Sequence, residues 1–167
     1  MNVSKSKGKA GAAEGSKQLC TFFVDNLFFG VDVTRVQEVI RYQEMTRVPL
    51  ASPVVGGLIN LRGQIVTAID MRRRLGLPPR RADQRPMNVV VRGDEGVVSL
   101  LVDEIGDVVD VDESWFEQPP ATMSAGAREL IRGVYKLKQQ LLLLLDTEKA
   151  THVAPHDATR GAVELGR

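Results

Sequence analysis

The sequence predicts a mainly β protein made of two small barrels of about five strands each, packed on one another. Three observations predict this fold class. Short apolar runs of strand length fill the chain, turn signals separate them, and the same elements recur in the same order in both halves. The chain has 167 residues, of which 43% are hydrophobic and 26% charged. These values are typical of a soluble globular protein.

The first apolar runs follow one another closely. Residues 18–25 and 27–32 are rich in aromatic and β-branched side chains and surround Asp25-Asn26, a pair typical of tight turns. The same pattern predicts further strands over residues 39–43, 64–69, 87–92, 96–102 and 107–112. In the last of these runs valines alternate with aspartates, which is the period of a half-buried strand.

The final two runs, residues 133–138 and 140–145, are predicted to form a hairpin. The second run contains five successive leucines, which show no period. A strand buried on both faces and a short helix both fit these leucines, and their small number favours the strand. The single cysteine, Cys20, lies within the first strand, where we expect a small buried thiol.

Helical signals are few and short. Asp32 can cap a helix over Val33–Glu38, and Asp70 can cap a helix over Met71–Leu75 that a glycine and a proline would end. Four aspartates follow strand ends and are predicted to cap the next turn: Asp32, Asp70, Asp103 and Asp146.

An internal repeat links the two halves of the chain. The matching pairs are Asp32 and Asp103, Ile40 and Val111, and Pro49 and Pro120 at an offset of 71 residues, then Gly57 and Gly133, Ile65 and Leu141, and Asp70 and Asp146 at an offset of 76 residues. Chance similarity among valine-rich strands is the alternative. Neither half offers much core by itself, so we expect an apolar interface between the two barrels.

The ends of the chain differ in composition from its centre. Residues 1–16 are rich in Lys, Ser, Gly and Ala and are predicted to be a disordered tail. Residues 17–149 are predicted to form the folded domain, and residues 150–167 a weakly ordered tail. We expect a cytoplasmic protein, because neither a signal peptide nor an apolar run of the ~20 residues that cross a membrane is present.

Side chains suited to catalysis or metal binding are sparse. Both histidines, His152 and His156, lie in the predicted tail, and two histidines without a third ligand make a poor zinc site. No nucleotide-binding loop, nucleophile elbow or paired-cysteine motif occurs in the sequence. The sequence therefore predicts no metal, no cofactor and no enzymatic activity.

Charge is distributed unevenly, although the net charge is only +1. Residues 94–117 contain nine acids and no Lys or Arg, whereas residues 72–85 contain six arginines. We predict an acidic face and a basic loop that orient charged partners, with two mutually balancing solvated surfaces as the alternative. A barrel that binds nucleic acid is a further alternative, but the arginines lack the interleaved aromatic residues on which bases stack.

The most specific stretch runs from residue 56 to residue 66. Arg62-Gly63 is predicted to be a tight turn between two strands, with Gly63 free to take a positive φ. Arg62 then lies on a constrained corner, from which its guanidinium can make paired hydrogen bonds with a partner. A turn arginine paired with a local carboxylate is the alternative.

Several segments resemble the CheW family of chemotaxis coupling proteins. The pattern N-L-R-G-x-I-V-x-x-x-D over residues 60–70 is the most specific, and V-Q-E-V-I over residues 36–40 and L-V-D-E-I over residues 101–105 agree with it. The resemblance covers about residues 17–149. It implies two SH3-like barrels around a shared hydrophobic core and an adaptor without catalytic activity.

The resemblance also implies two partners, the signalling tip of a methyl-accepting chemoreceptor and the regulatory domain of a CheA-type histidine kinase. The motif match carries over six interface positions: Val36, Glu38, Gly57, Arg62, Gly63 and Val108. The charged pair would supply polar recognition, the valines apolar groove surface, and the glycines a backbone that stays close to a partner or preserves a turn. A CheW-like module of a non-chemotaxis chemosensory pathway is the alternative.

Overall fold

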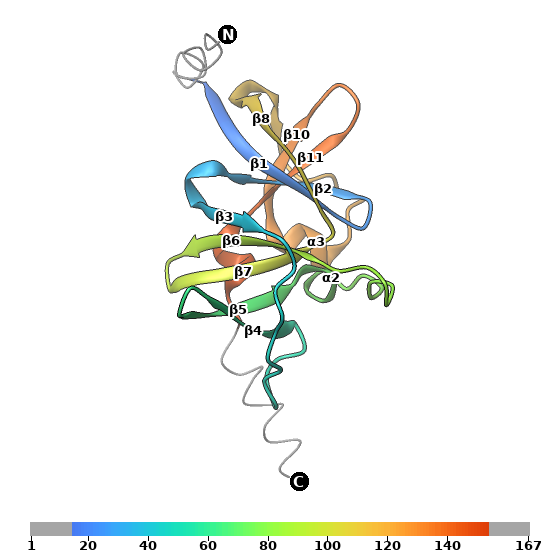
Figure 1. The fold of residues 1–167 in the computed structure, drawn as a ribbon. Coiled ribbons are helices and arrows are strands. Elements are labelled where there is room, and N and C mark those ends of the chain that lie inside the picture. Colours follow the sequence, from blue (N-terminus) through green and yellow to red (C-terminus); the bar gives the residue numbers. More distant parts are fainter. Residues whose placement is uncertain (1–14, 154–167) are drawn as a thin grey trace.

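A computed structural model describes residues 15–153 of the protein (Figure 1). The strands are β1 (Ser16–Val24), β2 (Leu27–Asp32), β3 (Val36–Ile40), β4 (Val55–Leu61), β5 (Gln64–Asp70), β6 (Met87–Gly93), β7 (Gly96–Val102), β8 (Glu104–Asp112), β9 (Phe116–Glu117), β10 (Ile131–Lys136) and β11 (Leu141–Leu145). The short helices are η1 (Val33–Arg35), α2 (Met71–Arg74), η2 (Glu113–Trp115), α3 (Ala125–Leu130) and α4 (Thr147–Thr151). Predictions for residues 1–14 and 154–167 lie outside the described residues.

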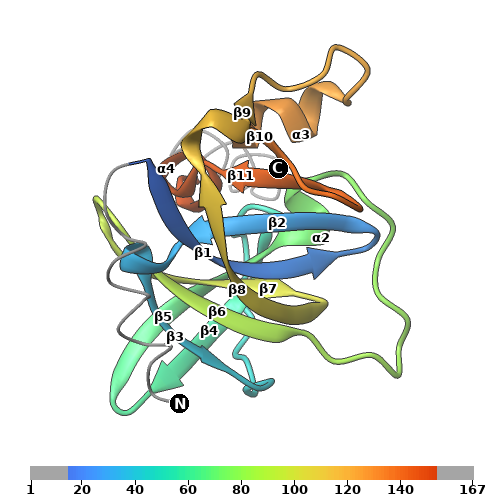
Figure 2. The ribbon, with the colours of Figure 1, turned by 90° about the horizontal axis from the view of Figure 1, so that it is seen from above.

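The strands form two stacked sheets. The six-stranded sheet has the order β8-β1-β2-β11-β10-β9, and the five-stranded sheet has the order β3-β6-β7-β5-β4. In Figure 1 the first sheet lies above the second, and Figure 2 looks down on the first, with β8 in front. The predicted fold class, mainly β with two SH3-like barrels, is confirmed. The additional strand in the first sheet is β9, which has only two residues.

The edges of each sheet meet, which is how a barrel removes exposed strand edges. In the five-stranded sheet Thr46, which follows β3, forms an antiparallel bridge with Leu58 of β4 through backbone hydrogen bonds of 2.8 and 2.9 Å. Met45 also packs against an interior cluster that includes Ile59. In the six-stranded sheet, edge strand β8 continues through η2 into the opposite edge strand β9.

The predicted repeat corresponds to equivalent strand pairings in the two sheets. Hairpin β1–β2 matches hairpin β6–β7, and β2 runs parallel to β11 as β7 runs parallel to β5. However, each half of the chain places its first hairpin in the barrel of the other half, because β1 and β2 join β8–β11 while β6 and β7 join β3–β5. The barrels are therefore not consecutive in sequence, and neither half contains a complete one.

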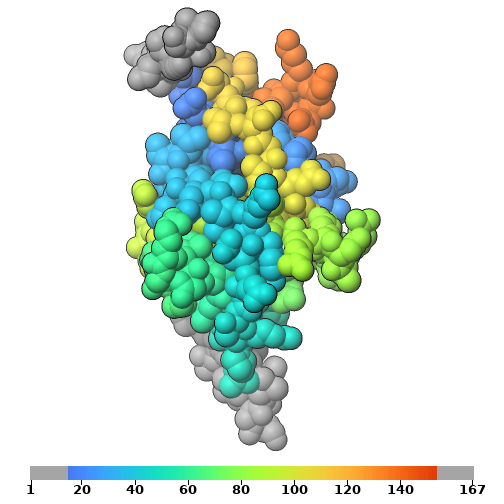
Figure 3. Space-filling model, viewed as in Figure 1, coloured from blue at the N-terminus to red at the C-terminus, as the bar shows by residue number. Residues whose placement is uncertain are grey.

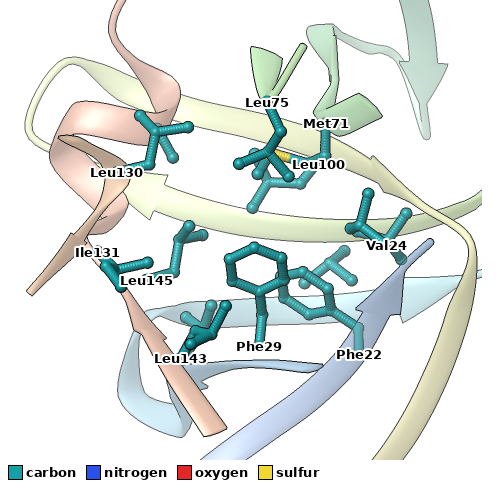
Figure 4. Packing of buried hydrophobic residues seen from close by; sticks show 14 of the residues in the cluster. Phe22, Val24, Phe29, Met71, Leu75, Leu100, Leu130, Ile131, Leu143 and Leu145 are labelled. Atoms are coloured by element: carbon teal, nitrogen blue, oxygen red, sulfur yellow. The ribbon is translucent and has the colours of Figure 1, made fainter. Parts of the chain in front are cut away.

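Buried side chains form a core shared by both sheets and a smaller cluster within each barrel. Figure 4 shows Phe22 and Phe29 of the six-stranded sheet pointing towards Leu100 of the five-stranded sheet. In β11, Leu143 and Leu145 belong to the shared core, whereas the alternate leucines belong to the cluster inside the six-stranded barrel. The leucine run is therefore a strand buried on both faces, and the apolar interface between barrels is confirmed.

The helix predicted over Val33–Glu38 is wrong beyond Arg35. Only η1 is helical, and Val36–Ile40 forms strand β3, which pairs with β6. Three of the five residues in β3 are β-branched, which favours an extended conformation. Asp32 still caps the turn, because its side chain accepts a hydrogen bond from the Thr34 amide at 2.9 Å.

Two helices close the second half of the chain. Helix α3 was not predicted from the sequence, and Ser124 caps it by accepting a hydrogen bond from the Ala127 amide. Asp146 caps α4 as predicted, with the Lys149 amide 3.1 Å from its Oδ1. The tail predicted from residue 150 begins within this helix, and Ala150 is buried in the shared core.

Tyr135 gives the fold a predictable response to alkali. Its ring is fully buried, and burial together with the Glu113 carboxylate, 3.4 Å from its hydroxyl, raises the pKa of Tyr135 to about 12. An unfolded tyrosine titrates near ~10. Because the folded pKa is the higher one, this contribution to stability is complete below about pH 10 and is lost as the pH rises towards 12.

We therefore expect the free energy of unfolding to decline between about pH 10 and pH 12, and Tyr135→Phe to flatten that decline. Urea denaturation at each pH, followed by fluorescence of the single tryptophan, Trp115, measures the free energy of unfolding. Tyr42→Phe is the control and should keep the decline of the unsubstituted protein. An equal decline in Tyr135→Phe would assign the alkaline sensitivity to other groups.

Candidate partner-binding site

Arg62 and Gly63 form the predicted two-residue turn, which joins β4 to β5. Both residues have positive φ values, 52° and 90°, and the Asn60 side chain accepts a hydrogen bond from the Gly63 amide at 2.8 Å. Turns of this kind favour asparagine followed by glycine, because both positions need a positive φ. An arginine in this conformation costs of order 1 kcal/mol or more. The turn therefore contains an arginine that local backbone preferences do not favour.

Glu38 of β3 holds the Arg62 side chain. Arg62 Nη2 donates to Glu38 Oε2 at 2.5 Å, and the Arg62 side chain is 73% exposed whereas that of Glu38 is 20% exposed. The hydrogen bond from Arg62 is the main cause that lowers the pKa of Glu38, and the same bond raises the pKa of Arg62. Within residues 15–153, Arg62 bonds to Glu38 alone, so its other donors remain open to solvent.

This pairing brings together two of the six candidate positions, which lie 24 residues apart in the chain. The alternative prediction, a turn arginine paired with a carboxylate of the same chain, therefore describes the observed contact, and Glu38 supplies the carboxylate. The pair links β3 to the β4–β5 turn, at the same junction where Thr46 and Leu58 close the barrel. An exposed pair of this kind contributes little to stability, because water and salt screen it.

Gly57 lies at a register shift between β4 and β5. Its φ is 153°, and a Cβ at this position would lie 2.9 Å from both the Thr46 carbonyl oxygen and the Met45 Cβ. The space beside Gly57 is therefore occupied by the chain itself at the closure of the barrel. Of the two roles expected for this glycine, preservation of the local backbone agrees with these contacts.

Gly57→Ala is expected to destabilise the protein by about 1–3 kcal/mol, because alanine meets the Thr46 backbone and disfavours this φ. In a domain of this size, each kcal/mol lowers Tm by about 2–4 °C in scanning calorimetry. Gly126→Ala is the control, since the nearest atom to its Cβ would be 3.9 Å away. Equal Tm values for wild type and Gly57→Ala would mean that the Met45–Thr46 segment moves aside without cost.

The two candidate valines have different environments. Val36 is half-buried, pairs with Val91 of β6 and packs against the shared core, so it has a structural role. Val108 lies in β8 of the other sheet, opposite Cys20, and is 56% exposed. The surface view in Figure 3 shows residues of β3 and β8 on the same face of the molecule. Val108 is thus the better placed of the two to contact a partner.

The arginine-rich loop is only partly a basic surface. The side chains of Arg72 and Arg80 are 12% and 9% exposed, and both contact the Asp103 carboxylate, which is 5% exposed. Arg72 Nη2 and Arg80 Nε each donate to Asp103 at 2.8 Å, and the Asp25 amide donates to it at 2.6 Å. The prediction that Asp103 caps the next turn is therefore wrong, because its oxygens accept these bonds instead.

Electrostatics favour the ionised form of Asp103. Burial by itself raises the pKa of this carboxyl, but the hydrogen bonds from Arg72 and the Asp25 amide and the charge of Arg80 outweigh burial, so the pKa is lowered. The network connects the β1–β2 turn of the six-stranded sheet with α2 and the loop beside the five-stranded sheet. The only feature of the sequence that pointed to this ion-pair network was the run of arginines close to a predicted acidic region.

Other chemistry has little support among residues 15–153. No three His, Cys, Asp or Glu side chains in that range are grouped to hold a metal ion. None of the helices there has both the length and the apolar character needed to span a bilayer. Cys20 is buried as predicted, and burial raises the pKa of its thiol.

Comparison with known proteins agrees with this arrangement of barrels and with the motif around Arg62. The family model of the CheW-like domain matches residues 18–154. The chain belongs to the CheW-like family. The matched residues include both barrels and all six candidate positions, because the match extends over nearly all the described residues.

Curated CheW relatives align over most of their length. The chain is 30% identical to the chemotaxis protein CheW of Bacillus subtilis, over 88% of this chain and 92% of that protein. It is also 30% identical to CheW of Klebsiella aerogenes, over 84% of each chain. The crystal structure of the scaffolding protein CheW from Thermoanaerobacter tengcongensis superposes with a TM-score of 0.73 at 25% identity, covering 82% of this chain and 93% of that one.

Proposed function

We propose that the protein is a non-enzymatic adaptor in the cytoplasm that couples chemoreceptors to a CheA-type histidine kinase. The names of the CheW relatives, a chemotaxis protein and a scaffolding protein, support a role in chemotaxis as a scaffold. The single observation that carries the proposed interface is the state of Arg62. A residue in a disfavoured conformation, held by one carboxylate and otherwise exposed, is suited to bind a second carboxylate on a partner.

The adaptor acts through the geometry of its surfaces. One surface binds the receptor tip and another binds the kinase, so the protein sets their relative position. The shared core is close-packed across both sheets, and such cores transmit displacement instead of absorbing it. Signalling then requires only that the complex favour one kinase state over another, and allosteric couplings of this kind are typically ~1–3 kcal/mol. Several contacts per partner in an array add avidity.

Co-sedimentation with receptor-containing membranes tests this proposal. Wild type is expected to bring a CheA-type kinase into the membrane pellet, and Arg62→Ala is expected to recruit much less kinase while remaining folded. Arg81→Ala is the matched control, because Arg81 is also exposed (79%) and also forms an ion pair, yet lies outside the candidate positions. A wild-type protein that neither sediments nor recruits kinase would direct the search to another chemosensory pathway.

A further inference from the structure

A pocket of about 710 Å³ lies between the β6–β7 turn and helices α3 and α4. It joins the two barrels, because the β6–β7 turn belongs to the five-stranded sheet, whereas α3 and α4 flank the β10–β11 hairpin of the six-stranded sheet. None of the six candidate partner-binding residues lines it. Its volume is within the range of sites that bind small ligands. The pocket is therefore a separate feature that the proposed adaptor function does not use.

The pocket walls are held in place by hydrogen bonds. Arg74 Nη2 donates to the carbonyl oxygens of Lys149 and His152, at 2.6 and 2.9 Å, and so fixes the end of α4. Glu148 accepts from Arg35 Nη1 at 2.7 Å, which ties α4 to η1 and compensates the charge of this glutamate. The pocket is thus preformed, and a ligand would not have to create it.

The remaining charges around the pocket have both signs. Two cations and three acids line it and form no salt bridge with any residue in the described part of the chain: Arg74, Lys149, Asp94, Glu95 and Glu129. Because these cations and acids do not pair with each other, charges of both signs are available to a ligand. A simple cation would meet the two positive side chains, and a simple anion would meet the three acids. A ligand that carries one charge of each sign is complementary to the whole rim.

The Arg74 guanidinium lacks an acceptor. Its Nε is buried without a hydrogen-bond partner, and no other buried side-chain nitrogen or oxygen among the described residues is in that state. Nη1 also forms no hydrogen bond within residues 15–153, because both bonds of this side chain start from Nη2. Buried polar groups are nearly always paired, so this guanidinium indicates an acceptor from outside the described chain. A carboxylate matches the geometry of a guanidinium best.

We propose that the pocket binds a small aliphatic zwitterion of the dipeptide class. Its carboxylate would contact Arg74 and Lys149, and its ammonium group would contact Glu129 and the acids of the β6–β7 turn. The aliphatic side chains would lie against the apolar part of the lining, which Val97, Val98 and Leu130 supply. Such a ligand would bridge the two barrels, since its two ends contact elements of both.

Titration of the full chain with leucyl-leucine at pH 7, followed by amide chemical shifts in NMR, tests this proposal. We expect saturable shifts of residues 94–98, Glu129 and Leu130, with a Kd of about 0.2 mM from the ligand efficiency typical of molecules of this size. N-acetyl-leucyl-leucine lacks the ammonium group, leucyl-leucinamide lacks the carboxylate, and glycyl-glycine lacks the aliphatic side chains. Each of these analogues should bind at least about fivefold more weakly.

Neutral variants assign the two ends of the ligand. Glu129 and Lys149 are both exposed, and their side chains form no hydrogen bond or ion pair with the described chain, so their amide variants should remain folded. Glu129→Gln should weaken leucyl-leucine about fivefold but leave the acetylated analogue unchanged. Lys149→Gln should weaken leucyl-leucine and leave leucyl-leucinamide unchanged. Lys138→Gln, which removes an exposed cation between β10 and β11, is the control and should bind leucyl-leucine as the unsubstituted protein does.

Three results would overturn the proposal. The first is the absence of saturable shifts at leucyl-leucine concentrations well above the expected Kd. The second is an analogue without one charge that binds as tightly as leucyl-leucine, which would contradict recognition of both charges. The third is a set of shifts that lies away from the pocket or that survives both neutral variants. The titration contains neither receptor nor kinase, so its outcome is independent of the proposed adaptor function.

Discussion

Asp103→Ala is expected to lower the free energy of unfolding by about 3–5 kcal/mol, because removing one member of a buried ion pair leaves charge without compensation. Arg72 and Arg80, 12% and 9% exposed, would both lose their shared carboxylate. The Asp25 amide would also lose its acceptor. In a domain of this size, the corresponding fall in Tm is roughly 6–20 °C. Urea denaturation and scanning calorimetry measure the two quantities.

The control for this change is Asp110→Ala. Asp110 is an exposed acid on β8 that forms no ion pair with a residue of the described chain, so its loss should change stability by at most about 0.5 kcal/mol. A loss below about 1 kcal/mol in Asp103→Ala would show that Asp70, which also lies within salt-bridge distance of Arg80, takes over the pairing. Replacing Asp103, Arg72 and Arg80 together by apolar residues should recover much of the loss.

The same network gives a pH dependence. The pKa of Asp103 is lowered in the folded protein, while an unfolded aspartate titrates near ~3.9. The stabilisation is therefore complete above the unfolded pKa and is lost as the pH falls through the lower, folded pKa. Wild type should lose more stability than Asp103→Ala when the pH drops below about 4. Equal slopes for the two proteins would contradict the lowered pKa of Asp103.

Local patterns were enough to predict much of the fold. Turn residues, β-branched runs and the repeat located most strands, and the leucines of β11 were recognisable as a strand by their number. The exchange of hairpins between halves was not predictable, because strand partners far apart in sequence leave no local periodicity. For the same reason the helix predicted over residues 33–38 was too long. Its valines also fit a strand, and residues 36–40 form a strand because they pair with β6, which is far away in the sequence.

The candidate site shows a similar division. The motif identified Arg62 and Gly63 as a turn, because two adjacent positive φ values have a local signature. The contact between Arg62 and Glu38 depends on closure of the barrel. The sequence therefore identified both residues as candidate positions but did not predict that they contact each other. The role of Asp103 was missed because its partners lie 31 and 78 residues away, beyond the reach of a capping pattern.

Arg62→Asn separates the two roles that an arginine in this turn can have. Asparagine accepts the positive φ of 52° more readily than arginine does, so the substitution should leave the free energy of unfolding unchanged or raise it by up to about 1 kcal/mol. The same change removes the exposed guanidinium. Arginines at the centre of interfaces contribute about 2 kcal/mol or more, so we expect binding to receptor or kinase to weaken by about thirtyfold.

Titration calorimetry with receptor fragment and kinase regulatory domain measures this effect, beside thermal denaturation of the same samples. Glu38→Gln is the companion variant, because it keeps the shape of the partner side chain but removes the charge that holds Arg62. We expect it to weaken binding less than Arg62→Asn does, since the guanidinium remains present but less ordered. A variant that is more stable yet fails to bind would show that the disfavoured arginine is maintained for a partner. A variant that loses stability and binds normally would identify the Arg62–Glu38 pair as a closure of the barrel alone.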